Sequence, residues 1–265
     1  MPDTQKMIPR ATPLTPIKKA IVVGASGGIG TALVRRLAEE GYVLALLDRS
    51  EDILNPLCDE INQVYGETRA VPYEHDATAY DKVPDFFRKI VADLGGLDLF
   101  VYVAGMIYFP AMDEFNFAED YKMVEVNLLG AMAWMSQVAP AFQSMGSGQI
   151  VGVSSVAGDR GRVSNPGYNA SKAGFTCYLE ALRNRLTRHG VNVITIKPGQ
   201  VKTGVFDLPN APEKPVLAVT AEQAAEGIWK AIKKRKQVAY VGGIWRWVML
   251  VLTHIPSVIF RRLSF

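Results

Sequence analysis

The stretch from Lys18 to Gly30 constrains the fold most, because it has the pattern of a strand, a glycine-rich turn and the start of a helix. The run Lys18-Lys19-Ala20-Ile21-Val22-Val23 is followed at once by Gly24-Ala25-Ser26-Gly27-Gly28-Ile29-Gly30. An amphipathic helix is expected next, since apolar residues recur there at helical spacing. Glycines let a backbone approach a pyrophosphate, whose charge then meets the amides at the helix start. The stretch indicates a dinucleotide site, although a glycine turn alone is weak evidence.

An acidic residue stands at the end of the second apolar run. Residues 42–47 are expected to form a buried strand that ends at Asp48, and Arg49 follows directly. A carboxylate there can accept hydrogen bonds from both hydroxyls of an adenosine ribose and would repel a 2′-phosphate. A guanidinium at Arg49 could instead bind that phosphate. Because Asp48 is the residue that ends the strand, we expect NAD as the cofactor in preference to NADP.

Apolar runs and helical patterns alternate along the rest of the chain. All-apolar strands indicate a sheet buried on both faces, and alternation with helices indicates βαβ units. The pattern predicts one α/β domain, residues 18–243, with a Rossmann-type, doubly wound parallel sheet of about seven strands flanked by helices. Besides the first two strands, we expect strands at 69–73, 97–103, 149–153, 191–196 and 238–241, and a long helix at 118–145.

Tyr168 and Lys172 lie four residues apart, so on a helix they share one face. A free phenol has a pKa near ~10 and is a poor base at neutral pH, but a nearby ammonium lowers that pKa. Reaching neutrality needs about 4 kcal/mol, so a second positive charge such as an oxidised nicotinamide ring would have to help. Ser155 follows the fifth expected strand and could donate a hydrogen bond to the same substrate oxygen. Taken alone, Tyr-x-x-x-Lys is more often a solvated helix face.

Taken together, these elements resemble the classical short-chain dehydrogenase/reductase family over roughly residues 18–242. The likeness rests on the order and spacing of Gly24-x-x-x-Gly28-x-Gly30, Asp48, Asp76, Asn127, Ser155, Tyr168-x-x-x-Lys172 and Pro198-Gly199-x-Val201-x-Thr203. Each motif is weak singly, but the set is highly specific. The resemblance implies an enzyme that interconverts a secondary alcohol and a ketone with NAD or NADP.

The resemblance also implies roles for individual residues. Tyr168 would be the general acid/base, Lys172 would lower its pKa and hold the nicotinamide ribose, Ser155 would bind the substrate oxygen, and Asn127 would anchor a proton-relaying water. Asp76 would contact the adenine edge, or would merely cap the next helix. The implied cofactor contacts are Gly24, Ser26, Gly28, Ile29, Gly30, Asp48, Arg49, Asp76, Ala104, Gly105, Tyr168, Lys172, Pro198, Gly199, Val201 and Thr203.

One departure from the family pattern follows the fourth expected strand. The family usually carries Asn-Asn-Ala-Gly there, whereas this chain has Tyr102-Val103-Ala104-Gly105. The asparagines normally tie neighbouring strands together near the adenine. Independently of this departure, a competing hypothesis is a nucleotide-binding scaffold or redox sensor without catalysis. Its signature would be the loss of Tyr168, Lys172 or Ser155, and all three are present.

Composition excludes several other classes. The net charge of +3 gives no strong field for nucleic acid. Cys58 and Cys177 lie far apart in no metal or redox spacing, which is typical of reduced thiols in a cytosolic protein. The three histidines do not cluster, so we expect no metal site. Residues 1–17 are proline-containing and lack the apolar core of a secretory signal, so they are expected to form a flexible leader.

The C-terminal tail, residues 244–265, is apolar. Residues 244–260 carry one formal charge, Arg246, and Arg261-Arg262 follow. At 1.5 Å per residue a helix of this length would extend roughly 25 Å, which is marginal for crossing a bilayer core. Tryptophans and flanking arginines suit contact of residues 244–262 with a membrane interface. An arm packed on a second subunit or across its own pocket is the alternative, and the sequence leaves both open.

The substrate end of the chain is less constrained. Residues 106–117 form an apolar and aromatic loop that could line a pocket, and residues 204–218 have the irregular, proline-containing composition of a lid. The loop at 106–117 and the tail favour a lipophilic small-molecule alcohol or ketone. The family resemblance further implies a homodimer or homotetramer.

Overall fold

The structure, a computed structural model, describes residues 18–211 and 217–263. The expected leader, 1–17, and residues 212–216 of the expected lid therefore lie outside the described residues. The strands are β1 (Lys18–Val23), β2 (Tyr42–Asp48), β3 (Ala70–Glu74), β4 (Leu99–Tyr102), β5 (Gln149–Val153), β6 (Asn192–Pro198), β7 (Val201–Lys202), β8 (Val219–Thr220) and β9 (Val238–Val241). The α-helices are α1 (Gly28–Glu39), α2 (Glu51–Tyr65), α3 (Val83–Leu94), α4 (Phe117–Val124), α5 (Gly130–Met145), α6 (Pro166–Leu186), α7 (Ala221–Lys233), α8 (Trp245–His254) and α9 (Ser257–Phe260).

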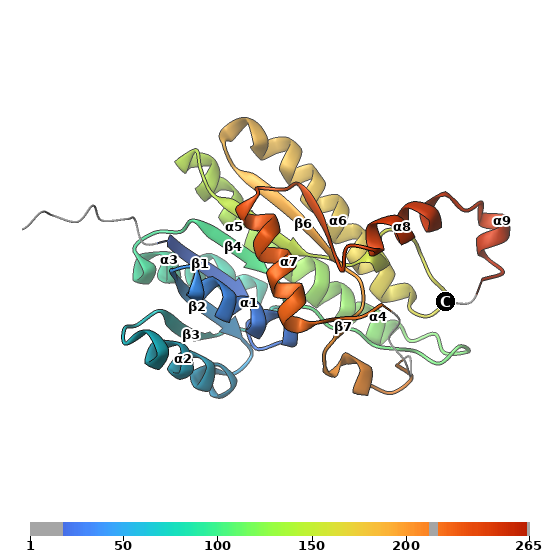
Figure 1. The fold of residues 1–265 in the computed structure, drawn as a ribbon, viewed down its shortest axis with the longest axis horizontal. Coiled ribbons are helices and arrows are strands. Elements are labelled where there is room, and N and C mark those ends of the chain that lie inside the picture. The colour runs from blue at the N-terminus through green and yellow to red at the C-terminus, as the bar shows by residue number, and fades with distance from the viewer. Residues whose placement is uncertain (1–17, 212–216, 264–265) are drawn as a thin grey trace, which may run out of the picture.

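Seven strands of the described chain form one sheet in the order β3-β2-β1-β4-β5-β6-β9. Every neighbouring pair in it is parallel. The strand order reverses between β1 and β4, so the chain segments that leave the carboxyl ends of these two paired strands run to opposite faces of the sheet and leave room for a ligand between them. The expected Rossmann-type, doubly wound sheet is thereby confirmed (Figure 1).

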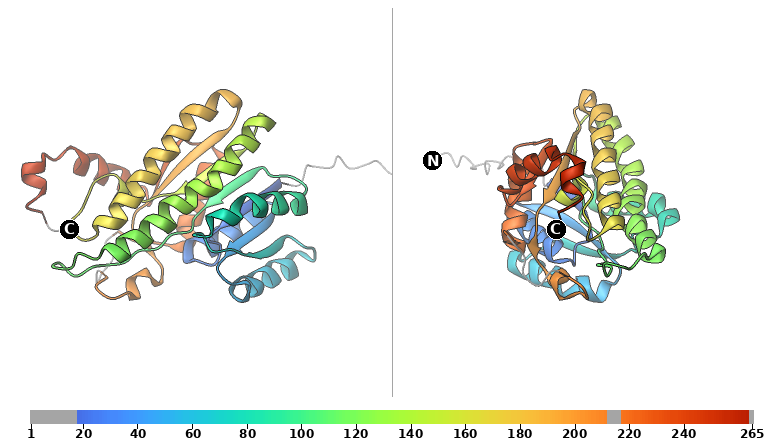
Figure 2. Two further views of the ribbon diagram at one scale, coloured as in Figure 1. Left: turned by 180° about the vertical axis from the view of Figure 1, so that it is seen from behind. Right: turned by 90° about the vertical axis from the view of Figure 1, so that its right-hand side faces the viewer.

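Helices cover both faces of the sheet, as Figure 2 shows. Alternate residues of β1 enter different cores, since Ala20 and Val22 pack with α1, α2 and α7 while Ile21 and Val23 pack with α3, α5 and α6. Burial of both faces explains why the strands are continuously apolar. The core residues Ala20, Ile21 and Val22 are fully inaccessible to solvent.

Two parts of the structure differ from the expected elements. The helix expected at 118–145 consists of α4 and α5 separated by a π-helical turn, Glu125–Leu129, that contains Asn127. The segment after β6 contains a separate pair of short parallel strands, β7 and β8, which no sequence pattern predicted. Two-residue strands are too short to carry a periodicity.

The tail forms two helices, because Pro256 separates α8 from α9. The inner side of α8 buries Trp245 and Met249, which pack with Val156 beside the end of β5. The tail therefore packs on the protein's own body through this side, while its outer side stays exposed. No described helix is long and apolar enough to span a bilayer.

Candidate active site

The glycine turn forms a tightly packed cradle at the carboxyl end of β1. Gly24 has a φ of +91°, which disfavours any residue with a Cβ atom, and a Cβ there would lie 2.4 Å from the backbone nitrogen of Ala104. A Cβ on Gly28 would lie 2.6 Å from the Thr203 methyl group. Helix α1 begins directly after Gly27, which provides no side-chain cap. The glycine turn, Ala104 and Thr203, which belong to three expected cofactor segments, therefore meet here. Because no side chain caps α1, the amides of its first turn are left to other acceptors.

Asp48 closes one side of this cradle. Its Oδ2 accepts hydrogen bonds from the Ser26 hydroxyl at 2.6 Å and from the Ser26 amide at 3.1 Å. Its Oδ1 accepts from the amide of Arg49, whose side chain is exposed. The carboxylate thus orients the turn itself. These three donors leave about one of the roughly four acceptor positions of a carboxylate free, so Asp48 can also accept from a ribose hydroxyl.

Asp76 and His75 follow β3. The Asp76 carboxylate accepts from the amide and hydroxyl of Thr78, both at 2.8 Å, and these hydrogen bonds lower the pKa of Asp76. The structure thus places Asp76 in a turn that precedes the next helices. His75 is buried and receives a hydrogen bond from the Trp134 indole, and burial lowers its pKa. Sequence reasoning did not assign that buried pair.

Helix α6 is positioned by a capping asparagine. The buried Asn165 accepts from the amide of Tyr168 at 3.1 Å and donates to the carbonyl of Tyr108. It therefore fixes the first turn of α6, which carries the phenol, against the loop that follows β4. Asn-Pro at a helix start is a recognisable signal, an N-cap followed by proline at N1, and could have revealed this residue from the sequence.

Tyr168, Lys172 and Ser155 converge at the carboxyl end of β5. The Lys172 ammonium donates to the carbonyl of Val153 at 3.1 Å and lies 5.8 Å from the centre of the Tyr168 ring. The Ser155 hydroxyl is close enough to the phenol to lower its pKa. Ser154 joins β5 to α6 by hydrogen-bonding the carbonyl of Lys172. The structure therefore brings together the three residues that the sequence singled out.

The titration of the site is governed by burial. Burial raises the pKa of Tyr168, while the nearby Ser155 and the Arg162 guanidinium lower it. Burial also lowers the pKa of Lys172 to about 8. We expected Lys172 to depress the phenol pKa, but the groups that lower it are Ser155 and Arg162, and burial outweighs them. The phenol is therefore protonated at neutral pH in the protein alone, and a further positive charge is needed to make it a base.

Asn127 is completely buried in the π-helical turn. Its Oδ1 accepts from the amide of Met106 at 2.8 Å, and its Nδ2 donates to the carbonyl of Met106 and to the Ser171 hydroxyl, both at 3.0 Å. It therefore connects the loop after β4 with α6. Gly105 lies between Asn127 and Lys172, since a Cβ on it would be 3.0 Å from the Asn127 Oδ1 and 3.2 Å from the Lys172 ammonium.

Tyr102 occupies the first position of the departure from the family pattern. Its ring is fully buried and its hydroxyl donates to the carbonyl of Val126 at 2.6 Å. The amides of Val103 and Ala104 both donate to the carbonyl of Val23. In this chain β4 is thus joined to the π-helical turn by a phenol and to β1 by its own backbone.

The segment after β6 approaches both the cradle and the tail. Gly199 donates its amide to Val241, and a Cβ on it would lie 2.0 Å from the Trp245 indole nitrogen. The Trp245 ring therefore rests directly on Gly199. Val201 lies in β7, and Thr203 reaches Gly28. The expected cofactor segment thus lies between the glycine turn and α8.

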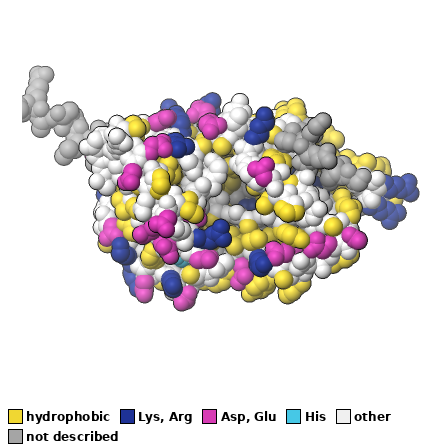
Figure 3. Space-filling view, turned by 90° about the horizontal axis from the view of Figure 1, so that it is seen from below, with side chains coloured by type: hydrophobic (Ala, Val, Ile, Leu, Met, Phe, Trp, Pro, Cys, Tyr) yellow, Lys and Arg dark blue, Asp and Glu magenta, His cyan; other side chains and the backbone are white. Residues whose placement is uncertain are grey.

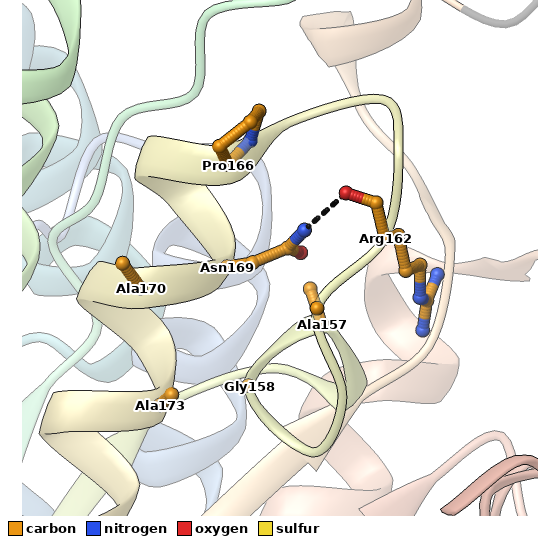
Figure 4. A pocket seen from close by; sticks show the side chains of 8 residues that line it. Ala157, Gly158, Arg162, Pro166, Asn169, Ala170 and Ala173 are labelled. Atoms are coloured by element: carbon orange, nitrogen blue, oxygen red, sulfur yellow. Dashed lines mark hydrogen bonds between the residues drawn. The ribbon is translucent and has the colours of Figure 1, made fainter. Parts of the chain in front are cut away.

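A recess of about 320 Å³ opens on the outer side of α6 (Figure 4). Figure 4 shows Asn169 reaching from α6 to the carbonyl of Arg162, with Ala170 and Ala173 below it. Ser155, Tyr168 and Lys172 do not line this recess, so it is distinct from the catalytic group. Arg162, which influences the pKa of Tyr168, was not assigned from the sequence, because an arginine in a loop matches no motif.

The comparisons with known proteins agree with this geometry. The family model described as "short chain dehydrogenase" matches residues 18–213. The chain belongs to the short-chain dehydrogenase family. An uncharacterized oxidoreductase of Myxococcus xanthus is 36% identical over 195 residues, which cover 74% of this chain and 76% of the relative. The ketoacyl reductase HetN of a Nostoc strain is 29% identical and is covered over 76% of its length, with 82% of this chain matched.

Solved structures show the same family likeness. An alcohol dehydrogenase of the archaeon Thermococcus sibiricus, complexed with 5-hydroxy-NADP, superposes with a TM-score of 0.74 at 28% identity. The match covers 84% of this chain and 94% of the archaeal chain. The protein is therefore an oxidoreductase of the short-chain dehydrogenase family. Among the described residues, no group of three His, Cys, Asp or Glu side chains could hold a metal ion.

Proposed function

We propose that this protein is a nicotinamide-dependent oxidoreductase that interconverts a secondary alcohol and a ketone, with Tyr168 as general acid/base. The observation that carries the proposal is the convergence of Tyr168, Ser155 and Lys172 at the carboxyl end of β5. Ligands of open parallel sheets bind at this edge. The names of its relatives, a ketoacyl reductase and an alcohol dehydrogenase, support the same reaction class.

The residues present fit a nicotinamide dinucleotide. The glycine cradle leaves the first-turn amides of α1 without a side-chain cap, as an anionic pyrophosphate requires. Within the described residues, the Lys172 ammonium has one hydrogen-bond acceptor, the carbonyl of Val153, so two of its three N–H groups can serve ribose hydroxyls. Pro198, Gly199, Val201 and Thr203 would border the nicotinamide end.

A bound nicotinamide supplies the hydride acceptor or donor for the carbinol carbon. Tyr168 would take the hydroxyl proton during oxidation and return it during reduction. Ser155 would hold the substrate oxygen by a hydrogen bond, and Lys172 would hold the ribose. Asn127, which joins Met106 to Ser171, would hold the loop that follows β4 against helix α6. It would also anchor a water beside Lys172.

Asp48 supports NAD in preference to NADP. The carboxylate is fixed by Ser26 at the place where an adenosine ribose would lie, and a 2′-phosphate would meet its negative charge. The exposed Arg49 is the adjoining group that could offset this repulsion. The archaeal relative complexed with an NADP derivative shows why the preference needs a direct measurement.

The proposed substrate is lipophilic and the proposed assembly is a homodimer or homotetramer. The loop at 106–117 and the inner side of α8 supply apolar groups at the substrate end, among them Met106, Trp245 and Met249. Ala170, Cys177 and Ala181 are exposed on the outer side of α6. Small residues of this kind permit close approach of a helix from a second copy.

The test is a panel of short- and long-chain secondary alcohols and ketones, followed at the nicotinamide absorbance with each cofactor in parallel. We expect turnover to be higher with NAD and with lipophilic substrates. Tyr168→Phe should lower turnover by about 10²- to 10⁴-fold, the usual contribution of acid–base catalysis, with cofactor binding nearly unchanged. Tyr178→Phe, at a partly buried position of the same helix that packs against the core, is the matched control.

Two outcomes would overturn the proposal. Undiminished turnover by Tyr168→Phe would remove the tyrosine from the mechanism. Tight nicotinamide binding without turnover of any substrate in the panel would favour the scaffold or redox-sensor hypothesis.

A further inference from the structure

The outer side of the tail exposes large apolar side chains. On α8, Trp247 and Val251 are each 63% exposed, and on α9 Val258 and Ile259 are 60% and 56% exposed. The inner side of α8 is buried through Trp245 and Met249. A helix that only needed to pack on the body would carry polar residues outside. The outer apolar side is therefore unexplained by the fold.

The charge of this face has one sign. From Gly242 to Phe265 the sequence contains no aspartate or glutamate, whereas Arg246, Arg261 and Arg262 are all exposed. Asp159 on the body lines the same recess as Arg246, but it is already paired with Lys197 and hydrogen-bonded by Tyr240. Figure 3 shows basic side chains beside hydrophobic ones at the end of the molecule that carries the tail.

The tail is held in place by specific contacts with the body. The Arg160 guanidinium donates to the carbonyls of Leu252 and Thr253 at 2.7 and 3.0 Å, where α8 ends, and lies 4.0 Å from the centre of the Phe260 ring. The Trp245 indole reaches the carbonyl of Leu217. The apolar outer face is thus presented at a fixed orientation.

A second apolar protrusion lies at the same end of the molecule. Figures 1 and 2 show the loop before α4 and the pair α8–α9 both extending from that end. In this loop and at the start of α4, Phe115 is 94% and Phe117 is 81% exposed. Asp113 is the exposed acid of the loop, while Glu114 is hydrogen-bonded by Tyr108 and Asn116.

We propose that the outer face of α8–α9, assisted by the loop before α4, docks on the surface of an anionic phospholipid bilayer. Tryptophan and aliphatic side chains enter the headgroup boundary, and Arg246, Arg261 and Arg262 contact lipid phosphates. A second copy of this chain meeting the same face about a two-fold axis would set arginines against arginines with no tail acid to pair them. Docking this way turns the substrate end of the sheet toward the lipid.

The experiment is co-sedimentation of the full-length chain with vesicles of phosphatidylcholine alone or mixed three to one with phosphatidylglycerol. We expect binding to the anionic vesicles and little to the neutral ones. Trp247→Gln/Val251→Gln should weaken partition by about tenfold. Arg261→Glu/Arg262→Glu should weaken partition onto the anionic vesicles by at least about tenfold, since each basic residue near an anionic surface contributes to the binding free energy.

Matched controls separate the tail from general surface properties. Ile53→Gln/Val64→Gln alters two α2 residues that are 56% and 70% exposed. Lys233→Glu/Lys234→Glu makes the same charge change at the end of α7. Both control pairs should leave partition within about twofold, because neither lies on the docking face.

Three results would overturn the proposal. They are an absence of wild-type binding to anionic vesicles, an equal loss in a control pair, and a fall in particle mass on light scattering of the tail variants in the absence of lipid. The last result would identify the face as a contact between copies. None of these readouts uses turnover, so failure here is distinguishable from failure of the proposed oxidoreductase activity.

Discussion

Helices α6 and α8 lie near the same end of the sheet but use their surfaces in opposite ways. Helix α6 turns its functional groups inward, so that Lys172 is only 4% exposed and hydrogen-bonded to β5. Helix α8 buries two side chains and leaves a wide apolar face in solvent. The difference teaches that the proposed catalytic role of α6 is recognisable by the spacing of its polar groups, whereas the proposed docking role of α8 is recognisable only when the structure shows which apolar side is free.

Two tryptophans of α8, two residues apart, give the strongest test of this comparison. Trp245 is buried on Gly199, so Trp245→Ala should destabilise the protein by about 3 kcal/mol through loss of packing. Trp247 is largely exposed, and Trp247→Ala should change stability by less than about 0.5 kcal/mol. Chemical denaturation followed by circular dichroism measures both. Equal losses would mean that α8 has no distinct inner and outer sides.

The second test concerns the buried ammonium of α6. Burial lowers the folded-state pKa of Lys172 from 10.5 to about 8. Below pH 8 both states are protonated, and the desolvation penalty of the folded state is fully present. Between those pKa values the unfolded chain binds more protons, so this group makes stability rise with pH.

Lys172→Met should lack this dependence. The stability of wild type relative to the variant should rise by about 2 kcal/mol between pH 7 and pH 9.5. Titration of Tyr168, whose pKa is raised by burial, is common to both proteins and largely cancels. Lys122→Met, on the exposed side of α4, should show no such change. A pH-independent difference for Lys172→Met would place the ammonium in water.

The fold was predictable because its signals repeat along the chain. Apolar runs alternate with helical patterns along most of the chain, and a sheet covered on both faces is the arrangement that buries such runs. Helical spacing predicted that Tyr168 and Lys172 share one face of a helix, but it took the accompanying motifs to place that face in a site. Convergence of Ser155 with them followed from the rule that carboxyl ends of parallel strands share one edge.

Other features had no signal in the sequence. The π-helical turn at Asn127 interrupts a pattern that fits one continuous helix, and only its bonds to Met106 and Ser171 explain the insertion. The balance between burial and charge at Tyr168 depends on distances that spacing does not give. The tail sequence is apolar almost all round, so it could not reveal which side packs on Gly199.

The smallest predicted effect concerns the attachment of the tail. Arg160→Ala removes two hydrogen bonds to the end of α8 and the stacking on Phe260, which should lower the local opening free energy of residues 252–260 by about 1 kcal/mol. Amide hydrogen exchange should therefore accelerate roughly fivefold in this segment, with the amides of α6 unchanged.

Arg188→Ala, in an exposed turn after α6, is the control and should leave the tail amides as they are. Arg160→Lys should fall between wild type and the alanine variant, because an ammonium keeps the charge but not the planar fork that spans two carbonyls. Unchanged exchange in Arg160→Ala would mean that Trp245 and Met249 alone orient the tail. Faster exchange in α6 as well would mean that α6 and α8 open as one unit, so the contrast between a fixed catalytic helix and a separately attached docking helix would not hold.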